Sequence, residues 1–597
     1  MSTPSPFPSP LPSSSSSSSP PPAPPQLSTA HLDTFVQDHL PPASLQPDTL
    51  LDLPTLRFPS RLNCATELLD GPSGPADRAG RLAVLSPNGV RWTYAELLAT
   101  VSRIAHVLTE DMGLVPGNRV LLRGANTPML VAIWLAVVRA GGVVVATMPL
   151  LRAKELAYVI DKARITHALC ESALGAELEA AEADGRPLRT MYFLGGARGD
   201  WDAKADPGAD LETAMAQHSD WFPPVDTAAT DPCLIAFTSG TTGMPKATVH
   251  SHRDVMAVCC SFPQHVLRAT SDDRFIGTPS LAFTYGLGGL LLFPLHIGAS
   301  VVLLDRASPQ QLARAIDEFR ATVCFSGPTA YRAMCMDPAP YGMSSLRECV
   351  SAGEPLPPVT RKMWKQRTGH DLIDGLGSTE MLHIFIAMRG DEAATRPGAL
   401  GRPVPGYLAA IVDDAGRPLP YGEVGALAVK GPTGCRYLDD DRQVDYVRNG
   451  WNLTGDACWA DKDGYLHYHA RLDDMIVSAG YNISPVEVEA TLLTHPAVRE
   501  CAAVAAPDDE RGAVVQAHVV LAKGHAPSPE LVLELQQFAK AEMAPYKYPR
   551  AIAFCDELPR AGTGKVQRFR LRGAPAPADG SGPSAELEGV TGDAASA

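Results

Sequence analysis

The sequence has little positive charge. Its 51 lysine and arginine residues face 66 aspartate and glutamate residues, which gives a net charge of −15 at pH 7. Proteins that bind nucleic acid rely on cationic side chains to neutralise phosphates, so this balance argues against a general affinity for DNA or RNA. A local cationic pocket for a small phosphorylated molecule stays compatible with it.

The chain also lacks the cysteine spacing of a zinc-binding motif or of a redox-active dithiol. Its 12 cysteines include no C-x-x-C pair, a usage that suits a reducing cytosol. The longest apolar region, 129–151, is interrupted by Arg139 and Gly141-Gly142, and it predicts a buried helix and a buried strand, with no membrane span. The N-terminus has no apolar h-region, and its first lysine or arginine is Arg57. We therefore expect a cytoplasmic protein.

Two stretches of the sequence are too poor in apolar residues to fold. Residues 1–30 are mostly serine and proline, and residues 573–597 are rich in glycine, alanine, proline, serine and acidic residues. Neither stretch buries enough apolar surface to offset the entropy lost on ordering, and we expect two disordered tails. Between them we expect a large domain over 31–472 and a small domain over 473–572.

Within the large domain, short apolar runs alternate with amphipathic segments of helical length. Strands are expected at 120–122, 143–146 and 301–304, and a helix is expected at 309–319. This alternation predicts the α/β class, with parallel sheets covered by helices and ligands at the carboxyl ends of strands. The pattern of the small domain predicts a compact α+β unit, with helices and strands at 475–478, 485–493, 498–505, 514–521, 529–542 and 551–554.

One loop carries the strongest chemical signal. It follows the apolar strand expected at 233–237 and reads Thr238-Ser239-Gly240-Thr241-Thr242-Gly243-Met244-Pro245-Lys246. Such a loop wraps backbone N–H groups, hydroxyls and one ammonium around a polyphosphate. It is not a Walker A loop, because its two glycines lie too close together and Pro245 separates the second glycine from Lys246.

This loop resembles the phosphate-binding signature of the adenylate-forming superfamily, which comprises acyl-CoA synthetases, luciferases and peptide-synthetase adenylation domains. Further segments match the other signatures of that superfamily in the same order, at 351–355, 375–380, 452–456 and 559–565. The resemblance covers about residues 60–570. It implies a large N-terminal domain of parallel-rich sheets flanked by helices plus a distorted β-barrel, and a small mobile α+β C-terminal domain.

The resemblance also implies a role for each signature. Mg²⁺ would be held by Glu380 and the ribose of ATP by Asp456, while Arg471 would reach the ribose or a phosphate. The remaining contacts to ATP would come from Thr238, Ser239, Gly240, Thr241, Thr242, Gly243, Lys246, Gly353, Glu354, Pro355, Gly377, Ser378 and Thr379. The chain departs from the superfamily pattern at three positions, where Leu376 replaces an aromatic residue and Ala470 and Ala479 replace glycines.

The reaction implied by the resemblance has two steps. A carboxylate attacks the α-phosphate of MgATP, giving an acyl-adenylate and pyrophosphate, with Lys246, Glu380 and Lys565 as catalytic residues. Lys565 would stabilise the charge that develops at the phosphate and the carboxylate. The small domain then turns about a hinge at Asp473 and presents Ala479 and Gly480, where the pantetheine arm of coenzyme A enters. Its thiol attacks the adenylate, and AMP leaves.

The identity of the acid is indicated by further resemblances. The segments 281–288 and 375–385 resemble benzoate–CoA ligases, in which the acid pocket is lined at positions matching Thr284, Tyr285, Gly377, His383 and Ile384. A flat aryl ring would fit between Tyr285 and the backbone of Gly377. His383 is either a satisfied core histidine or a contact of a ring substituent. The N-terminal segments 31–42 and 61–65 are similar to 2-aminobenzoate–CoA ligases, whose ortho amino group needs an acceptor such as Thr284 or His383.

Three functions stay open on the sequence. The first is an ATP-dependent ligase that activates an aryl carboxylic acid of the benzoate or 2-aminobenzoate type and transfers it to coenzyme A. The second is a medium-chain acyl-CoA synthetase or an enzyme that loads carrier proteins. The third is a non-catalytic scaffold that keeps the fold. We expect small-molecule partners, and we leave a homodimer open.

Overall fold

The computed structural model describes residues 28–71, 77–183, 188–195, 210–238, 245–305, 307–337, 339, 341–393, 395–472, 474–478, 481–508, 511–543, 546–560 and 565–572. Its contacts divide the chain into two compact units, residues 1–472 with 561–565 and residues 473–560 with 566–597. Most of the two predicted tails, 1–27 and 573–597, lies outside the described residues.

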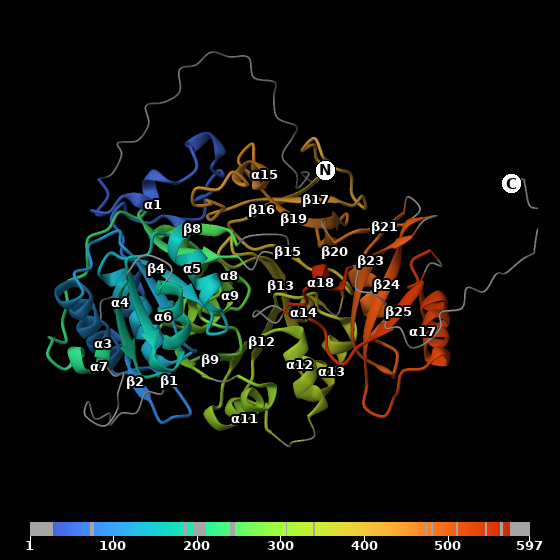
Figure 1. Ribbon diagram of the computed structural model, residues 1–597, viewed down its shortest axis with the longest axis horizontal. Helices are drawn as coiled ribbons and strands as arrows, with labels where there is room; N and C mark the ends of the chain where they lie inside the picture. The colour runs from blue at the N-terminus through green and yellow to red at the C-terminus, as the bar shows by residue number, and fades with distance from the viewer. Residues whose placement is uncertain are drawn as a thin grey trace, which may run out of the picture. The chain divides into compact units, whose positions relative to one another are not determined.

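The first sheet of the large unit runs in the order β6-β5-β3-β4-β7-β8, with its neighbours parallel except for the antiparallel edge pair β7–β8. Alternate residues of β3 and β4 point to opposite faces, so α3 and α4 cover one face and α5 and α6 the other (Figure 1). The elements are α3 Tyr94–His106, η4 Val107–Asp111, β3 Arg119–Arg123, α4 Pro128–Arg139, β4 Val143–Thr147, α5 Ala153–Lys162, β5 His167–Glu171, α6 Gly175–Ala183, β6 Arg189–Phe193, α7 Asp210–Met215, β7 Pro232–Phe237 and β8 Ala247–Ser251.

The second sheet has nine strands in the order β15-β14-β13-β12-β11-β9-β10-β1-β2, parallel from β13 through β1 and antiparallel at both edges. Helices α11, α12 and α13 pack on one face through a separate apolar cluster. The elements are β1 Leu82–Leu85, β2 Arg91–Thr93, α8 His252–His265, β9 Arg274–Gly277, α9 Thr284–Leu287, α10 Phe293–Ile297, β10 Ser300–Val302, α11 Pro309–Phe319, β11 Val323–Ser326, α12 Pro328–Met336, β12 Glu348–Ala352, α13 Pro358–Thr368, β13 Leu372–Gly377, β14 Ile384–Met388, α14 Gly390–Ala393 and β15 Arg402–Pro403.

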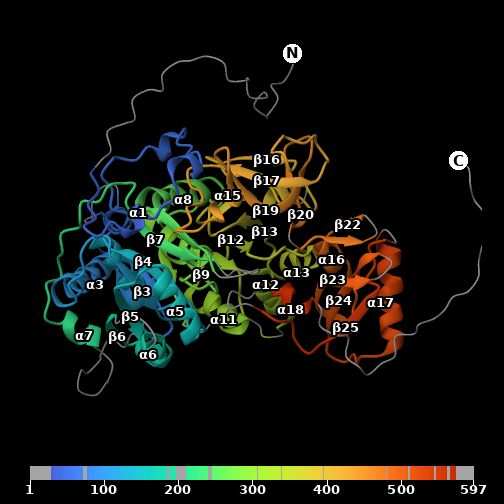
Figure 2. The same cartoon turned by 45° about the horizontal axis from the view of Figure 1, so that its top comes forward.

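A third, antiparallel sheet completes the large unit (Figure 2). It corresponds to the β-barrel expected from the resemblance, and it consists of β16 Leu408–Val412, β17 Gly425–Lys430, β18 Val447–Arg448, β19 Trp451–Ala460 and β20 Leu466–Arg471. The short helices α1 Phe35–Asp38, α2 Cys64–Asp70 and α15 Gln443–Tyr446 lie in the connecting segments.

The small unit has the α+β pattern that the sequence predicts. Its three-stranded sheet β23-β24-β25 packs against α16 and α17 through one apolar cluster. The elements are β21 Ile476–Ser478, β22 Tyr481–Ile483, α16 Pro485–Leu492, β23 Val498–Asp508, β24 Gly512–Leu521, α17 Pro529–Glu542, β25 Ala551–Phe554 and α18 Arg568–Leu571. The hairpin partner β22 was not predicted, because three residues are too few to show a period.

The apolar region 129–151 is confirmed as a buried helix, α4, followed by a buried strand, β4. Across the described ranges, the helices are all too short or too polar to cross a membrane. The 12 cysteines are all free thiols, and ten of them are buried.

Candidate active site

The predicted phosphate loop connects the antiparallel edge strands β7 and β8. The backbone N–H of Thr238 donates to the carbonyl of Lys246 at 2.9 Å, and the Lys246 N–H donates to the Thr238 hydroxyl at 3.2 Å. These bonds close the base of the loop. Its tip, with Ser239, Gly240, Thr241, Thr242 and Gly243, lies outside the described residues, as do the predicted hinge Asp473 and the tunnel residues Ala479 and Gly480.

Lys246 and Glu380 are joined by a tyrosine that sequence reasoning missed. The Lys246 Nζ donates to the Tyr437 hydroxyl at 3.2 Å and lies 4.9 Å from the centre of its ring. The Tyr437 hydroxyl in turn donates to Glu380 Oε1 at 2.6 Å. Burial, followed by the charge of Glu380, raises the pKa of Tyr437 far above its usual range, so the phenol stays protonated and keeps donating.

Glu380 sits in a tight turn that the surrounding strands hold in place. The carbonyl of Thr379 contacts the buried His250 Nε2 at 2.8 Å, and the N–H of Leu382 donates to the same carbonyl at 3.1 Å. Leu382 adopts a φ of +68°, a left-handed conformation that costs free energy for a residue with a side chain. Strain of this kind persists only where the structure around it fixes the turn.

Asp456, the predicted ribose contact, and Arg471, predicted to reach the ribose or a phosphate, face each other across the pair β19–β20. The Arg471 Nη1 lies 3.2 Å from Asp456 Oδ1 and 2.8 Å from the carbonyl of Thr454. Burial raises the pKa of Asp456, and Arg471 opposes that shift. Gly455 has a φ of +76°, and a Cβ there would come within 2.6 Å of Arg471 Nη2, so the guanidinium occupies the space that this glycine leaves.

The contacts of Lys565 assign it to the large unit. Its Cε lies 4.0 Å from the point where a Cβ on Gly353 would stand, next to the predicted adenine-side turn. The protein packed around its ammonium, followed by the charge of Arg471, lowers the pKa of Lys565, while Asp456 and Glu354 act in the opposite direction. The side chain still reaches solvent, so displacement of part of its hydration, without full enclosure, accounts for the shift.

The predicted acid-pocket residues lie together at the carboxyl ends of the second sheet. Gly377 pairs with Ile384 in the β13–β14 register, and a Cβ on Gly377 would come within 2.8 Å of the His383 carbonyl oxygen. The rings of Tyr285 and His383 have centroids 5.8 Å apart. Thr284, beside Tyr285, opens the short helix α9. The structure therefore brings all five predicted residues to one place.

His383 is enclosed by aromatic rings, with the Phe293 centroid 4.5 Å and the Phe262 centroid 5.7 Å from its own. Neither of its ring nitrogens has a hydrogen bond of normal geometry within the described chain. Burial lowers its pKa to about 3, against a weak opposing effect of the Tyr285 backbone, so the imidazole is neutral. The neutral ring has one nitrogen that accepts hydrogen bonds, which is the atom that the second interpretation of the sequence, a contact with a ring substituent, requires.

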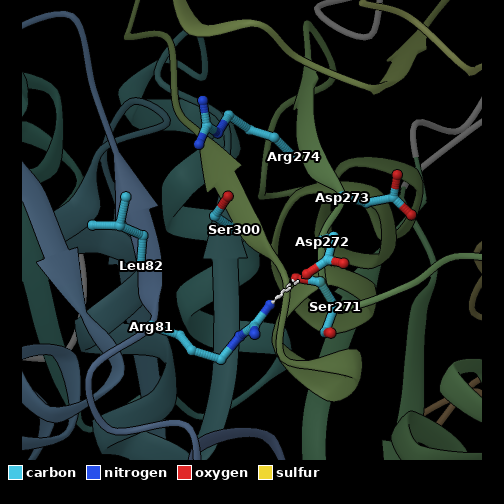
Figure 3. Close-up of a pocket in the computed structure, with 7 residues that line it drawn as sticks. All are labelled: Arg81, Leu82, Ser271, Asp272, Asp273, Arg274 and Ser300. Atoms are coloured by element: carbon cyan, nitrogen blue, oxygen red, sulfur yellow. Dashed lines mark hydrogen bonds and ion pairs between the residues drawn. The ribbon is translucent and has the colours of Figure 1, made fainter.

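One polar hollow of the large unit lies away from the candidate active site, and its position does not suit ligand binding in a sheet of this type. Its volume is about 240 Å³, and it is lined by Arg81, Leu82, Ser271, Asp272, Asp273, Arg274 and Ser300 (Figure 3). Leu82, Arg274 and Ser300 are the first residues of β1, β9 and β10. The hollow is thus at the amino ends of parallel strands, whereas such sheets bind ligands at the carboxyl ends.

Comparisons with known proteins agree with this geometry. Residues 74–436 match the family model described as AMP-binding enzyme, and residues 487–565 match that of the AMP-binding enzyme C-terminal domain. The chain is 33% identical over 530 residues to the benzoate–CoA ligase of Thauera aromatica, covering 87% of this chain and 98% of that protein. It is 32% identical over 540 residues to the mitochondrial acyl-coenzyme A synthetase ACSM3 of Rattus norvegicus, covering 87% and 91%.

Among solved structures, the anthranilate CoA ligase AuaEII in complex with anthranoyl-AMP superimposes with a TM-score of 0.80. The two sequences are 31% identical, and the match covers 87% of this chain and 98% of that one.

Proposed function

The chain belongs to the AMP-binding enzyme family, the adenylate-forming enzymes, and from this premise we propose that it activates an aryl carboxylic acid and transfers it to coenzyme A. The coarser activity, that of an AMP-forming acyl-CoA ligase using ATP and coenzyme A, follows from family membership. The proposal concerns the acid: benzoate or its 2-amino derivative.

The arrangement around His383 is the observation that carries the choice of acid. The single hydroxyl proton of Tyr285 is shared between the carbonyls of Ser326 at 3.1 Å and Val350 at 2.9 Å, which fixes the orientation of the ring. Gly377 has no side chain, and its backbone lies against that of His383. A fixed aromatic surface such as the Tyr285 ring favours a flat ring over a flexible chain, because stacking needs a planar partner.

The neutral imidazole of His383 suits an amino substituent. A buried nitrogen without a hydrogen bond costs about 1–3 kcal/mol, which a donor on the substrate would recover. An ortho amino group has such a donor, and benzoate has none. On this reasoning 2-aminobenzoate is the better substrate of the two.

In the adenylation step, Lys246 and Lys565 would balance the charge of the phosphates. Tyr437 would hold the side chains of Lys246 and Glu380 in position relative to each other. The carboxylate of Glu380 and the hydroxyl of Thr379 are oxygen donors, the ligand type that fits Mg²⁺. When bound, Mg²⁺ would supply charge neutralisation to the phosphates of ATP.

The similarity to the rat acyl-coenzyme A synthetase supports a second candidate, an aliphatic acid such as a medium-chain fatty acid. Both candidates use the same ATP site and differ only in the acid. A non-catalytic scaffold is disfavoured, because Lys246, Glu380, Asp456, Arg471 and Lys565 are all present.

A pyrophosphate-release assay with benzoate, 2-aminobenzoate and hexanoate, each with and without coenzyme A, tests the proposal. We expect release with both aryl acids, a higher kcat/KM for 2-aminobenzoate, and thioester only when coenzyme A is present. Preference for hexanoate would overturn the aryl assignment while leaving the ligase intact. No release with any of the three acids would count against all the acid assignments made here.

A further inference from the structure

A cluster of metal-binding side chains lies apart from the residues of the candidate active site. Helix α3 ends at His106 and continues as the single π-turn η4, which places Glu110 beside the ring of His106. The second histidine, His218, follows α7, which lies beside α3 (Figure 1). Glu110 and His218 are 108 positions apart in sequence, and His106, Glu110 and His218 hold their ligand atoms within 4.8 Å of one another.

The outer nitrogen of each histidine already has a hydrogen-bond acceptor. His106 Nε2 lies 2.9 Å from the carbonyl oxygen of Trp221, and His218 Nε2 lies 2.8 Å from Asp111 Oδ2. A carbonyl oxygen only accepts, so the Nε2 of His106 carries a proton, and a carboxylate oxygen of Asp111 accepts in the same way from the Nε2 of His218. With Nε2 occupied in this way, Nδ1 is the atom of each ring that is available to a metal ion.

Both Nδ1 atoms face the same carboxylate. His106 Nδ1 is 2.6 Å from Glu110 Oε1, and His218 Nδ1 is 3.6 Å from Glu110 Oε2, with the two rings stacked at 5.7 Å and only 3° from parallel. The three ligand atoms therefore converge on one point that a single cation can bridge. A proton bridges only His106 and Glu110, because 3.6 Å is too long for a hydrogen bond from His218.

We propose that His106, His218 and Glu110 bind a divalent transition-metal ion of the zinc class, at a site separate from that of ATP. Two imidazole nitrogens and one carboxylate oxygen are a ligand set that zinc uses, with water at the remaining position. Metal-bound histidines characteristically hold their second nitrogen on a carboxylate or a carbonyl, which here are Asp111 and the carbonyl of Trp221.

The exposure of the side chains fits such a site. The two histidine side chains are 17% and 14% exposed, so their orientations are fixed by packing, whereas Glu110 is 56% exposed and opens the site to water and to an incoming ion. The bound ion would tie the π-turn η4 to the segment after α7. Hard Mg²⁺ prefers an all-oxygen octahedron and should bind here far more weakly than zinc.

The test is calorimetric titration of the full-length, chelator-treated protein with Zn²⁺. We expect the wild type to take up one equivalent more than His218→Ala, and Glu110→Gln to weaken that site at least tenfold. His525→Ala, which removes an exposed histidine of the small unit, serves as the matched control and should bind as the wild type does. A site unchanged in both ligand variants, or no uptake by the wild type, overturns the proposal.

Trp221, whose carbonyl contacts His106, supplies a second readout, and Trp221→Phe separates its emission from that of the other tryptophans. Its side chain is 64% exposed and its carbonyl holds His106, so a quenching ion such as Cu²⁺ at the site should reduce its fluorescence. The loss of emission should be saturable in the wild type, absent in His218→Ala and absent in Trp221→Phe. Equal quenching in Trp221→Phe and the wild type would mean that the ion binds elsewhere. This readout is independent of catalysis, so it stands whether or not the acid assignment does.

Discussion

At the scale of single residues, one hydroxyl links two charged side chains of the candidate ATP site. Tyr437 bonds to both Lys246 and Glu380, and these partners lie 191 and 57 positions away in sequence. A hydrogen bond to a charged group contributes about 1.5–3 kcal/mol, so this side chain should matter as much as the residues of the recognised motifs.

Tyr437→Phe should lower kcat/KM for ATP about 10–100-fold while the ring keeps the packing intact. The matched control is Tyr446→Phe, whose hydroxyl lies 3.5 Å from the Ser378 hydroxyl and should contribute less. Steady-state kinetics with ATP varied would measure both. Equal losses in the two variants would contradict a special role for Tyr437.

Lys565→Ala should slow adenylation about 10²–10³-fold, because one preorganised cation is lost from the charge that develops at the phosphate. Thioester formation from a supplied acyl-adenylate should survive. Single-turnover pyrophosphate release and thioester formation would be measured separately. An unchanged rate of pyrophosphate release would rule out this role.

His383→Leu should reduce kcat/KM for 2-aminobenzoate about tenfold relative to benzoate, because the substituted side chain accepts no hydrogen bond. Thr284→Val is the companion variant, since its hydroxyl is the other acceptor proposed for the amino group. The ratio of kcat/KM for the two acids is the measurement. An unchanged ratio in both variants would show that neither side chain contacts the amino group.

At the scale of elements, the hairpin β19–β20 shows why a motif contains glycine. Gly455 and Gly464 both have positive φ, at +76° and +80°, but a Cβ on Gly455 meets Arg471 whereas nothing lies within 4 Å of one on Gly464. The two positions therefore separate backbone strain from displacement of a functional side chain.

Gly455→Ala and Gly464→Ala should each cost about 1–2 kcal/mol of unfolding free energy, the strain of a left-handed alanine. In Gly455→Ala, the Arg471 guanidinium must also move from Asp456, so the KM for ATP should rise about tenfold, while Gly464→Ala should keep the wild-type value. Urea unfolding and ATP kinetics on both variants give the comparison. An equal KM in the two would mean that Arg471 does not contact the nucleotide.

Helices and strands with strong local sequence signals were predictable, and those whose conformation depends on packing against other elements were not. Helix α11 was expected at 309–319 and occupies those residues, since Ser308 and Gln311 form a capping box and Pro309 begins the helix. The π-turn η4 has no such signal. Its wider turn is set by packing, and it gives Glu110 its position.

At the scale of the whole molecule, buried carboxyl groups tie stability to pH. Burial raises the pKa of Asp374 in β13 to about 6 from its ordinary 3.8, and Arg361 opposes the shift only partly. Between these values the folded state binds more protons than the unfolded chain, so stability falls as the pH rises from about 4 to about 6.

Asp374→Asn should remove this dependence, because the amide does not ionise. Relative to the wild type, its unfolding free energy should increase over that pH window by on the order of 2–3 kcal/mol and stay higher at neutral pH. Asp414→Asn, at an exposed position, is the control. Urea unfolding at several pH values would test this, and parallel curves for Asp374→Asn and the wild type would contradict it.

The sequence by itself determined the class of fold and the enzyme family, and it predicted which residues form the candidate ATP site. The phosphate loop, Glu380, Asp456 and Lys565 lie in short segments whose order and spacing are local properties of the chain, and strand and helix periods are local as well. Those signals survive without any knowledge of long-range contacts.

Only the tertiary structure decided which distant side chains meet. Tyr437 reaches Lys246, His250 supports Thr379, and His218 faces Glu110, because strand register and helix packing bring together residues from 108 to 191 positions apart. The sequence around a single tyrosine or histidine does not indicate which distant residue its side chain will contact. Its role comes from the register of a sheet or the packing of a helix, which the cooperative folding of the whole unit fixes.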